Sequence, residues 1–193
     1  MFELNKLRFA YPGKDFLFRG LSLALPAEAR VLLQGENGCG KSTLLNLITG
    51  RLEPTSGSIT ARAQDNYFYL PQKAESRILG INFDQDLELW EMAGLDPRGL
   101  KAHPLVQDFL PQFWELPLYE LSQGTKQAYM LAIALSHPHS YLILDEPYPA
   151  LDKRRQGILS ECLSQRQAML LVSHQRTELS FENVLTLKPG GIL

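Results

Sequence analysis

The sequence predicts an α/β protein built on a parallel sheet, and three observations carry that prediction. Predicted strands alternate with predicted helices over much of the chain, the order typical of a parallel α/β core. Residues 141–145, Tyr-Leu-Ile-Leu-Asp, form an almost continuous apolar run, as strands buried on both faces do. The stretch GENGCGKST at 35–43 lies directly between a predicted strand at 30–34 and a predicted helix that begins at Lys41 and ends near Gly50.

The remaining elements follow from local patterning. Alternation of apolar and polar residues predicts β-strands at 2–9 and 16–25, separated by turn residues at 10–15. A loop and short strand at 53–60 and a strand at 67–70 complete this β-rich first part. Residues 73–120 carry an imperfect helical stripe interrupted by prolines, which predicts a small helical insert. We then expect a helix capped by Ser122 and running to Leu135, a helix at 153–163, and strands at 168–173 and 183–188.

Composition bounds the class of protein. The chain has 193 residues, 45% hydrophobic and 21% charged, which suits one large domain with an ordinary core. Its formal net charge is −2, so no overall basic field favours nucleic acid, and we expect no nucleic-acid partner. Two cysteines make no disulfide framework, and no apolar run approaches the ~20 residues of a membrane span. The N-terminus lacks a signal-peptide pattern, so we expect a cytoplasmic protein.

The glycine-rich stretch matches the phosphate-binding pattern G-x-x-x-x-G-K-[ST] at Gly35, Gly40, Lys41 and Ser42. Glycines let backbone N–H groups turn inward around phosphate oxygens, and the helix N-terminus adds a positive dipole end. The Lys41 ammonium would reach the β- and γ-phosphates, and the Ser42 hydroxyl would bind Mg²⁺. The alternative is a glycine-rich turn without a ligand, but a chance match in a chain of this length is on the order of one in a hundred.

Two acids follow the apolar strand at 141–144. Asp145 and Glu146 lie at its carboxyl end, the edge where open parallel sheets bind ligands. Asp145 could hold Mg²⁺ through a water, and Glu146 could polarise a water for attack on the γ-phosphate. The alternative is a pair of solvated acids at a strand end.

Further motifs narrow the family. Gln72 ends YLPQ, and LSQGTKQ (121–127), LILDEP (142–147), ALD (150–152) and LVSHQ (171–175) follow in that order. With these motifs the sequence resembles the ATPase subunit of ABC transporters, from Tyr11 to about Lys188. The segment 71–90 is similar to ATPases of energy-coupling-factor and cobalt-type importers.

The resemblance implies a fold and a division of the chain. The expected fold is α/β: a P-loop NTPase core with a parallel sheet, an N-terminal antiparallel β subdomain and a small helical insert. Residues 1–193 would form a single ABC ATPase domain. In it, 1–72 and 136–193 make the β subdomain and nucleotide-binding core, and 73–135 make the helical signature subdomain.

The resemblance also implies roles for residues that match the family's motifs. Tyr11 would stack on adenine, although a hairpin-tip aromatic can also simply pack on the core. Gln72 would contact Mg²⁺ and link to the insert, and His174 would contact the γ-phosphate, where a histidine after a strand is otherwise usually structural. The implied catalytic set is Glu146, His174, Lys41 and Gln72, and the implied metal set is Ser42, Gln72 and Asp145. The implied nucleotide-binding set is Tyr11, Gly35, Asn37, Gly38, Cys39, Gly40, Lys41, Ser42, Thr43, Ser122, Gly124 and Asp152.

Ser122, Gly124 and Asp152 imply a second chain. In the family the signature residues Ser122 and Gly124 grip the γ-phosphate of ATP bound to the other subunit, and Asp152 acts across the dimer. Ser122 and Asp152 are also plausible helix caps, and the two roles are compatible. The resemblance therefore implies a head-to-tail homo- or heterodimer that closes around ATP and Mg²⁺.

The chain departs from the family's usual pattern at several positions. Gln123 stands where glycine is usual, Thr125 where glutamine is usual, and Pro149 where serine is common, so local geometry should differ there. Cys39 lies within the phosphate loop, beside a helix N-terminus and Lys41, which would lower the pKa of its thiol and favour alkylation. The simpler interpretation, which we prefer, is a small residue tolerated at a variable loop position.

The expected function is an ATP-hydrolysing subunit that powers transport through a separate transmembrane subunit, whose cytoplasmic helix would dock near residues 72–95. Such a chain would be peripheral on the inner face of the cell membrane, and a metal ion or vitamin is the expected imported cargo. Three alternatives stay open: an exporter motor, a soluble ABC-type ATPase not coupled to transport, and a small-molecule kinase. The signature LSQGT and His174 argue against the kinase.

Overall fold

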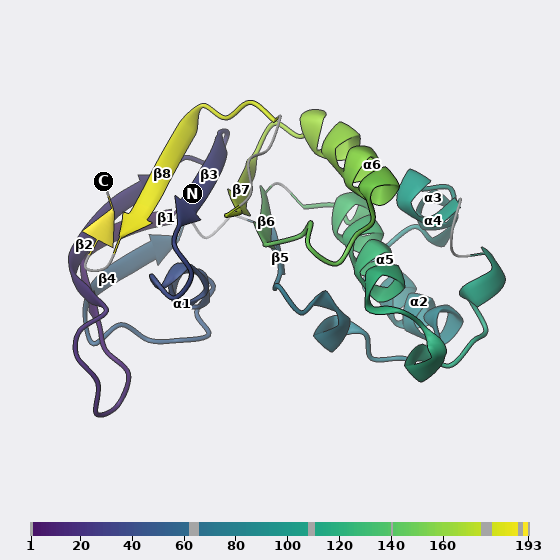
Figure 1. Cartoon of the computed structure of the whole chain (residues 1–193), viewed down its shortest axis with the longest axis horizontal. Coiled ribbons are helices and arrows are strands. Elements are labelled where there is room, and N and C mark those ends of the chain that lie inside the picture. The colour runs from purple at the N-terminus through teal and green to yellow at the C-terminus, as the bar shows by residue number, and fades with distance from the viewer. Residues whose placement is uncertain are drawn as a thin grey trace. The chain divides into compact units, whose positions relative to one another are not determined.

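The computed structural model describes residues 2–61, 66–107, 111–139, 141–174, 179–188 and 191–192 (Figure 1). The chain forms two compact units. The first comprises Met1–Tyr67, Ser140–Asp145 and Gln167–Leu193, and the second comprises Phe68–His139 and Glu146–Arg166. The second unit therefore includes the segment after Asp145 as well as the expected insert, and the functional boundaries at residues 72 and 135 stay a prediction.

A three-stranded antiparallel sheet in the first unit has the order β2-β1-β4, with β1 at Phe2–Phe9, β2 at Phe18–Leu25 and β4 at Ser56–Ala61. Alternating residues of β1 are buried, which is why the sequence pattern identified this strand. A bulge interrupts β1 at Lys6, whose φ is 48°. Gly57 of β4 faces this bulge, and a Cβ there would lie 2.5 Å from the Lys6 carbonyl oxygen, so only glycine fits.

In the second, six-stranded sheet, the strands that lie wholly in this unit follow the order β6-β7-β3-β8-β9. Its strands are β3 (Arg30–Gly35), β6 (Tyr141–Asp145), β7 (Met169–Val172), β8 (Asn183–Lys188) and β9 (Gly191–Ile192). All neighbours are parallel except β8 and β9. Every residue of β6 and β7 is buried, as expected for central parallel strands. The carboxyl ends of β3, β6 and β7 therefore meet at one edge, to which α1 (Lys41–Ile48) connects.

The strand β5 (Tyr67–Leu70) leads into the second unit. That unit is helical (Figure 1). Its elements are η1 (Ala74–Arg77), α2 (Phe83–Met92), α3 (Pro97–Lys101), α4 (Pro104–Gln107), η2 (Pro111–Phe113), η3 (Leu118–Glu120), α5 (Gln123–Ser136) and α6 (Lys153–Ser164). Within the described part of the chain, no helix is both long and apolar enough to cross a membrane.

The core of the second unit forms around α5, in which every residue from Gln127 to Ala134 is buried. The Tyr129 ring stacks on Phe83 of α2 with centroids 4.1 Å apart. The Tyr129 hydroxyl donates to Asp86 Oδ2 at 2.9 Å. Asp86 is fully buried, and burial together with this carboxylate raises the pKa of Tyr129. A buried polar contact thus fixes α2 against α5.

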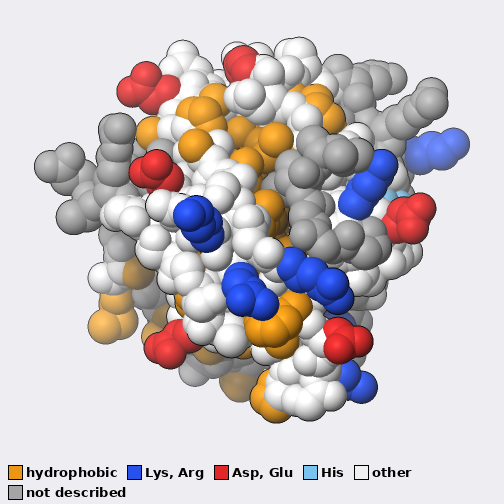
Figure 2. Space-filling model, turned by 90° about the vertical axis from the view of Figure 1, so that its left-hand side faces the viewer, with side chains coloured by type: hydrophobic (Ala, Val, Ile, Leu, Met, Phe, Trp, Pro, Cys, Tyr) orange, Lys and Arg blue, Asp and Glu red, His pale blue; other side chains and the backbone are white. Residues whose placement is uncertain are grey.

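The surface in view in Figure 2 carries both signs of charge. Acidic and basic side chains are interspersed there with apolar ones, and none of the three types covers the face. That mixture agrees with the small formal net charge of −2.

Candidate functional site

The phosphate-loop pattern lies between β3 and α1, as predicted. Gly40 is the N-cap residue of α1, with φ 106°, and Gly38 has φ 82°; both values favour glycine. A Cβ at Gly35 would lie 2.5 Å from the Leu187 carbonyl oxygen and 2.7 Å from Cys39 Sγ. The loop is therefore a tight main-chain turn that leads into a helix N-terminus, the geometry that exposes N–H groups to an anion.

Lys41 folds its side chain back over this loop. Its Nζ donates to the carbonyl oxygens of Gly35, at 2.8 Å, and Glu36, at 3.0 Å, and the residue is only 8% exposed. An ammonium group has three donors, so one remains beyond these two bonds. A cation is thereby fixed at the loop, within reach of any phosphate that the loop amides bind.

Tyr11 lies beside the start of α1. Its hydroxyl forms a 3.1 Å hydrogen bond with the Thr43 hydroxyl, and its ring meets Phe9 edge-on with centroids 5.0 Å apart. The Tyr11 side chain is nevertheless 43% exposed. Both interpretations from the sequence therefore agree with its position: it contacts the hairpin, and it presents an aromatic surface next to the phosphate loop.

Asp145 ends β6 at the same sheet edge, and it is 3% exposed. It pairs in register with Val172 of β7, which pairs with Leu33 of β3. At ~4.8 Å per strand, β6 and β3 are separated by roughly 10 Å. The acidic strand end and the glycine loop thus emerge from the same edge of one sheet.

His174 also belongs to this edge, because it follows Ser173 just after β7. The Ser173 N–H donates to the Leu33 carbonyl oxygen at 3.2 Å, which ties this segment to β3. The structure brings His174 into one pocket with part of the glycine loop. The pocket is lined by Gln34, Gly35, Glu36, Asn37, His174, Thr186, Leu187 and Lys188.

Glu146 has an unusual backbone. Its φ is 49°, in the left-handed region that non-glycine residues rarely adopt, and its side chain is 7% exposed. Such a conformation costs on the order of 1–3 kcal/mol and is concentrated at functional sites. This observation supports a specific role for Glu146 over the alternative of a solvated acid.

Cys39 is buried, with 4% exposure, and its Sγ fills the space next to Gly35. Burial of this kind fits the simpler interpretation from the sequence, a small packing residue in the loop. Ready alkylation of Cys39, the other interpretation, requires reagent access that the structure does not offer.

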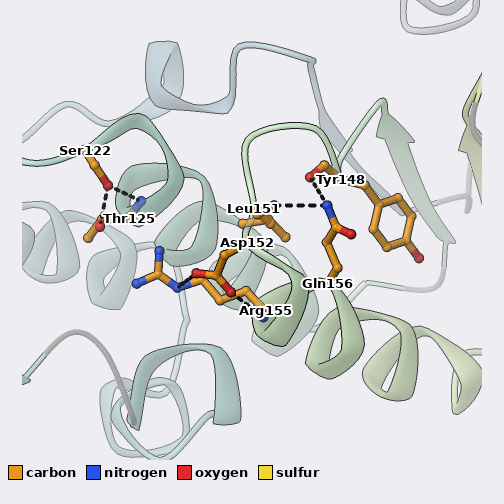
Figure 3. Close-up of polar contacts among 7 residues, drawn as sticks. All are labelled: Ser122, Thr125, Tyr148, Leu151, Asp152, Arg155 and Gln156. Atoms are coloured by element: carbon orange, nitrogen blue, oxygen red, sulfur yellow. Dashed lines mark hydrogen bonds and ion pairs between the residues drawn. The ribbon is translucent and has the colours of Figure 1, made fainter.

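Ser122 and Gly124 are found at the N-terminus of α5, in the second unit; Figure 3 shows Ser122. Ser122 is the N-cap: its Oγ accepts from the Thr125 N–H at 3.1 Å and lies 2.8 Å from the Thr125 hydroxyl. A Cβ at Gly124 would lie 2.5 Å from the Ala150 carbonyl oxygen. The signature turn therefore packs directly on the main chain of the segment that carries ALD.

Asp152 caps α6 and accepts from the Arg155 N–H at 2.9 Å. The Arg155 Nε lies 3.6 Å from Asp152 Oδ2 (Figure 3). Gln156 donates to the carbonyl oxygens of Tyr148, at 3.2 Å, and Leu151, at 3.0 Å, which holds the loop around Pro149 and Ala150. The signature turn and the ALD loop thus form one rigid group within the second unit.

Gln72 also belongs to the second unit, where it is exposed just before η1. The predicted site residues therefore fall into two groups. Tyr11, the glycine loop, Asp145 and His174 gather in the first unit, and Gln72, Ser122, Gly124, Glu146 and Asp152 belong to the second.

From the sequence, Thr125 was named only as a departure from the family pattern, and Arg155 and Gln156 were missed; all three residues shape the second group. The spacing Ser-x-x-Thr at a helix start was a usable signal for Thr125, because the N3 side chain commonly reaches back to the cap. Nothing local marks Arg155 or Gln156, since their partners become neighbours only through the loop that precedes α6.

The residues present fit a magnesium ion. Ser42 presents an exposed hydroxyl at the first turn of α1, and Asp145 supplies a carboxylate at the same sheet edge. Mg²⁺ prefers such hard oxygen ligands and keeps several waters, so one carboxylate and one hydroxyl suffice.

A family model described as "ABC transporter" matches residues 18–149. The chain belongs to the ABC transporter family. The match covers the glycine loop, the signature turn and the acidic strand end, and this family is one of ATP-binding ATPases.

Individual relatives agree. The chain is 33% identical over 188 residues to the ATP-binding protein Uup of Haemophilus influenzae, with 91% of this chain covered. It spans only 28% of that protein's length. It is 31% identical to the taurine import ATP-binding protein TauB of Pseudomonas fluorescens, covering 94% of this chain and 74% of that protein. It is 32% identical to the zinc import ATP-binding protein ZnuC of Yersinia enterocolitica, covering 89% and 69%.

Solved structures share the fold. The ATP-binding subunit of an ABC transporter superposes with a TM-score of 0.82 at 25% identity, covering all of this chain and 88% of that one. The dimeric ABC transporter cassette MJ0796 has the same TM-score at 20% identity, covering 100% and 96%. The predicted α/β fold with a P-loop NTPase core is confirmed.

Proposed function

We propose that this chain hydrolyses ATP, that it does so paired with a second ABC chain, and that it thereby drives transport through a separate membrane subunit. One observation carries the nucleotide part most directly. A buried lysine ammonium is hydrogen-bonded over a glycine loop at the N-terminus of α1, at the sheet edge where Asp145 also ends.

Each residue has a chemical task in this proposal. The loop amides and Lys41 hold the β- and γ-phosphates, and Ser42 with Asp145 would hold Mg²⁺, which neutralises phosphate charge when bound. A water oxygen bonds to the γ-phosphorus as the bond to the bridging oxygen breaks, giving ADP and phosphate. Glu146 accepts the proton from that water, and His174, Gln72 and Tyr11 position the nucleotide and the water.

The second chain supplies Ser122 and Gly124 to the γ-phosphate. Ser122 is exposed at the N-terminus of α5, so its hydroxyl and the helix dipole are open to an anion from outside the chain. A dimeric cassette among the structural neighbours supports pairing. Asp152, fixed beside the same turn, would act across the same interface.

An exposed apolar surface on the second unit supports a membrane partner. Leu79 and Ile81 are 78% and 73% exposed, and Tyr119 is 83% exposed. The Leu118 N–H donates to the Ile81 carbonyl oxygen at 3.0 Å, so these two segments adjoin. We assign this surface to a cytoplasmic helix of the membrane subunit, which would place the chain peripherally on the inner face of the cell membrane.

The importer names of TauB and ZnuC support import, and a metal ion or vitamin is the cargo class that the sequence favours. The name of Uup refers to ATP binding alone. A separate experiment is therefore needed to distinguish a transport ATPase from an ATPase that is not coupled to transport.

The hydrolysis proposal is tested with Glu146→Gln. We expect the variant to bind ATP but to hydrolyse it about 10²–10⁴-fold more slowly, because the group that accepts the proton from water is lost. It should accumulate as an ATP-bound dimer, because the γ-phosphates that hold the two chains together are not removed. Glu161→Gln, the same change at an exposed position of α6, is the control. ATPase turnover and light scattering after gel filtration give the readouts, and wild-type turnover in Glu146→Gln would refute the role of Glu146.

The transport arm uses Ile81→Asp. We expect this variant to lose co-purification with a multi-span membrane protein while it keeps ATP binding. Val184→Asp, which places the same charge at an apolar residue 55% exposed on β8, should keep both. If the wild-type chain isolated from cells carries no membrane protein, the transport role is wrong and an ATPase without transport replaces it.

A further inference from the structure

We propose that Thr125 is a positioning residue for Ser122: its hydroxyl donates to Ser122 Oγ and thereby turns the Ser122 proton outward, toward the γ-phosphate held by the second chain. The inference rests on the proposed function, because it concerns how this chain's signature turn meets that phosphate. It assigns a role to a residue at which the chain departs from the usual pattern of its family.

The two side chains form a layered pair at the start of α5 (Figure 3). Ser122 is exposed, whereas Thr125 lies directly beneath it with 5% exposure. The Ser122 Oγ accepts from the Thr125 N–H at 3.1 Å and lies 2.8 Å from Thr125 Oγ1. An accessible hydroxyl is thus backed by a buried one.

Counting donors and acceptors limits what this pair can do. A serine hydroxyl has one proton and two lone pairs, and the Thr125 N–H already occupies one lone pair. If the Thr125 hydroxyl donates as well, both lone pairs are occupied and Ser122 can only donate its own proton outward. If instead Ser122 donates to Thr125, its outward side is a lone pair, which repels an anion.

An approaching phosphate oxygen therefore selects the first arrangement. In that arrangement the Thr125 hydroxyl, Ser122 and the anion form a chain of hydrogen bonds in which each bond polarises the next. Because Thr125 is buried and fixed in the first turn of a helix, this order is established without recruiting a water. Without the Thr125 hydroxyl, the N-cap hydrogen bond would occupy only one lone pair of Ser122 Oγ, and the direction of the Ser122 proton would not be fixed.

The usual glutamine at this position would act differently. Serine at the N-cap with glutamine at N3 is a capping box, in which the glutamine side chain reaches back to the N-cap backbone N–H. The threonine side chain is shorter and meets the Ser122 side chain instead, at 2.8 Å. In this chain, Thr125 therefore contacts the very hydroxyl that would meet the phosphate.

The test compares Thr125→Val, which keeps the shape and removes the hydroxyl, with Thr125→Ser, which keeps the hydroxyl. Both are made in the Glu146→Gln background, alone or with the ABC chain that co-purifies. We measure the ATP-dependent dimer dissociation constant by analytical ultracentrifugation and ATP affinity of the separated chain by calorimetry. Thr125→Val should weaken the dimer about three- to tenfold, the effect of one hydrogen bond, while Thr125→Ser restores it.

ATP affinity of the separated chain should stay unchanged in both variants, because the glycine loop belongs to the first unit. If Thr125 had only a structural role, its substitution would lower the melting temperature. Thr125→Val and Thr125→Ser would then not differ in the dimer dissociation constant alone. Equal dimerisation of Thr125→Val and the parent, or equal weakening by valine and serine, overturns the inference.

Ser122→Ala distinguishes this inference from the proposed function. If Ser122→Ala dimerises as tightly as the parent, the proposed contact between signature and phosphate is wrong, and the inference fails with it. If Ser122→Ala weakens the dimer and Thr125→Val does not, the contact stands and only the role of Thr125 falls.

Discussion

The close approach of α5 to the ALD loop predicts the effect of Gly124→Ala. A Cβ at Gly124 would lie 2.5 Å from the Ala150 carbonyl oxygen, whereas ordinary contacts are 3.4 Å or longer, so about 0.9 Å must be gained by movement. The Ala150 carbonyl is main chain and the Cβ is attached directly to the main chain of α5, so neither can swing aside as the end of a long side chain can. Overpacking of this kind costs roughly 1–3 kcal/mol, and alanine returns up to ~1 kcal/mol of helix propensity.

Gly157→Ala is the matched control, because Gly157 lies in α6 and a Cβ there meets nothing within 4 Å. The control should gain about 0.5–1 kcal/mol from helix propensity alone. Gly124→Ala should therefore melt several degrees below Gly157→Ala, since ~1 kcal/mol corresponds to about 2–4 °C in a chain of this size.

The functional readout is the ATP-dependent dimer in the Glu146→Gln background. Moving the first turn of α5 by several tenths of an ångström displaces Ser122 from its cap geometry, so Gly124→Ala should weaken the dimer and Gly157→Ala should not. If the two variants melt together and dimerise alike, the inferred rigidity of the turn and loop is wrong.

Two further predictions concern buried groups of the second unit. The Asp86 carboxylate accepts hydrogen bonds from the Leu79 N–H at 2.6 Å, the Gly80 N–H at 3.1 Å and the Trp90 Nε1–H at 3.0 Å. Asp86→Asn replaces one carboxylate oxygen with an NH₂ group, which would point a donor at other donors. The substitution should therefore lower the free energy of unfolding by about 2–4 kcal/mol. Urea titration measures this loss, and Asp84→Asn, at an exposed ion pair, should change it by less than ~1 kcal/mol; equal losses would contradict the account. Burial, with the Arg166 guanidinium beside the ring, lowers the pKa of His139 to about 4. Between pH ~6.5, the ordinary pKa of histidine, and pH 4, His139 therefore binds a proton more readily in the unfolded chain than in the folded one. Stability falls as the pH falls through this window, by about 1 kcal/mol from pH 7 to 5 after allowance for solvent screening. His139→Asn should flatten this slope in melting curves recorded against pH, and an unchanged slope would show that another group titrates.

The regular elements were largely predictable because their signals are local. Alternation marked β1, the apolar run marked β6, and Ser122 marked the start of α5. The strand expected from residue 16 begins instead at Phe18, although the Leu17 N–H still donates to the Phe9 carbonyl oxygen at 2.8 Å. The short helices α3 and α4 were missed, since each spans little more than a turn and shows no period.

The site was predictable in its parts and not in its arrangement. The glycine loop and Lys41 are specified by a contiguous motif, so the sequence alone identified them. The packing of Gly124 on Ala150, the burial of Asp86 and the left-handed backbone of Glu146 depend on segments that are distant in sequence or on tertiary constraint. No pattern in a single sequence reports such contacts.

Calorimetric titration of ATP into the wild-type chain and Lys41→Ala tests the central claim most directly. The account predicts saturable binding by the wild type and a loss of affinity of at least tenfold in the variant, because the Lys41 ammonium is held at the loop by the Gly35 and Glu36 carbonyl oxygens, within reach of the expected phosphates. Equal ATP affinity in the two proteins, with both still folded, would contradict it.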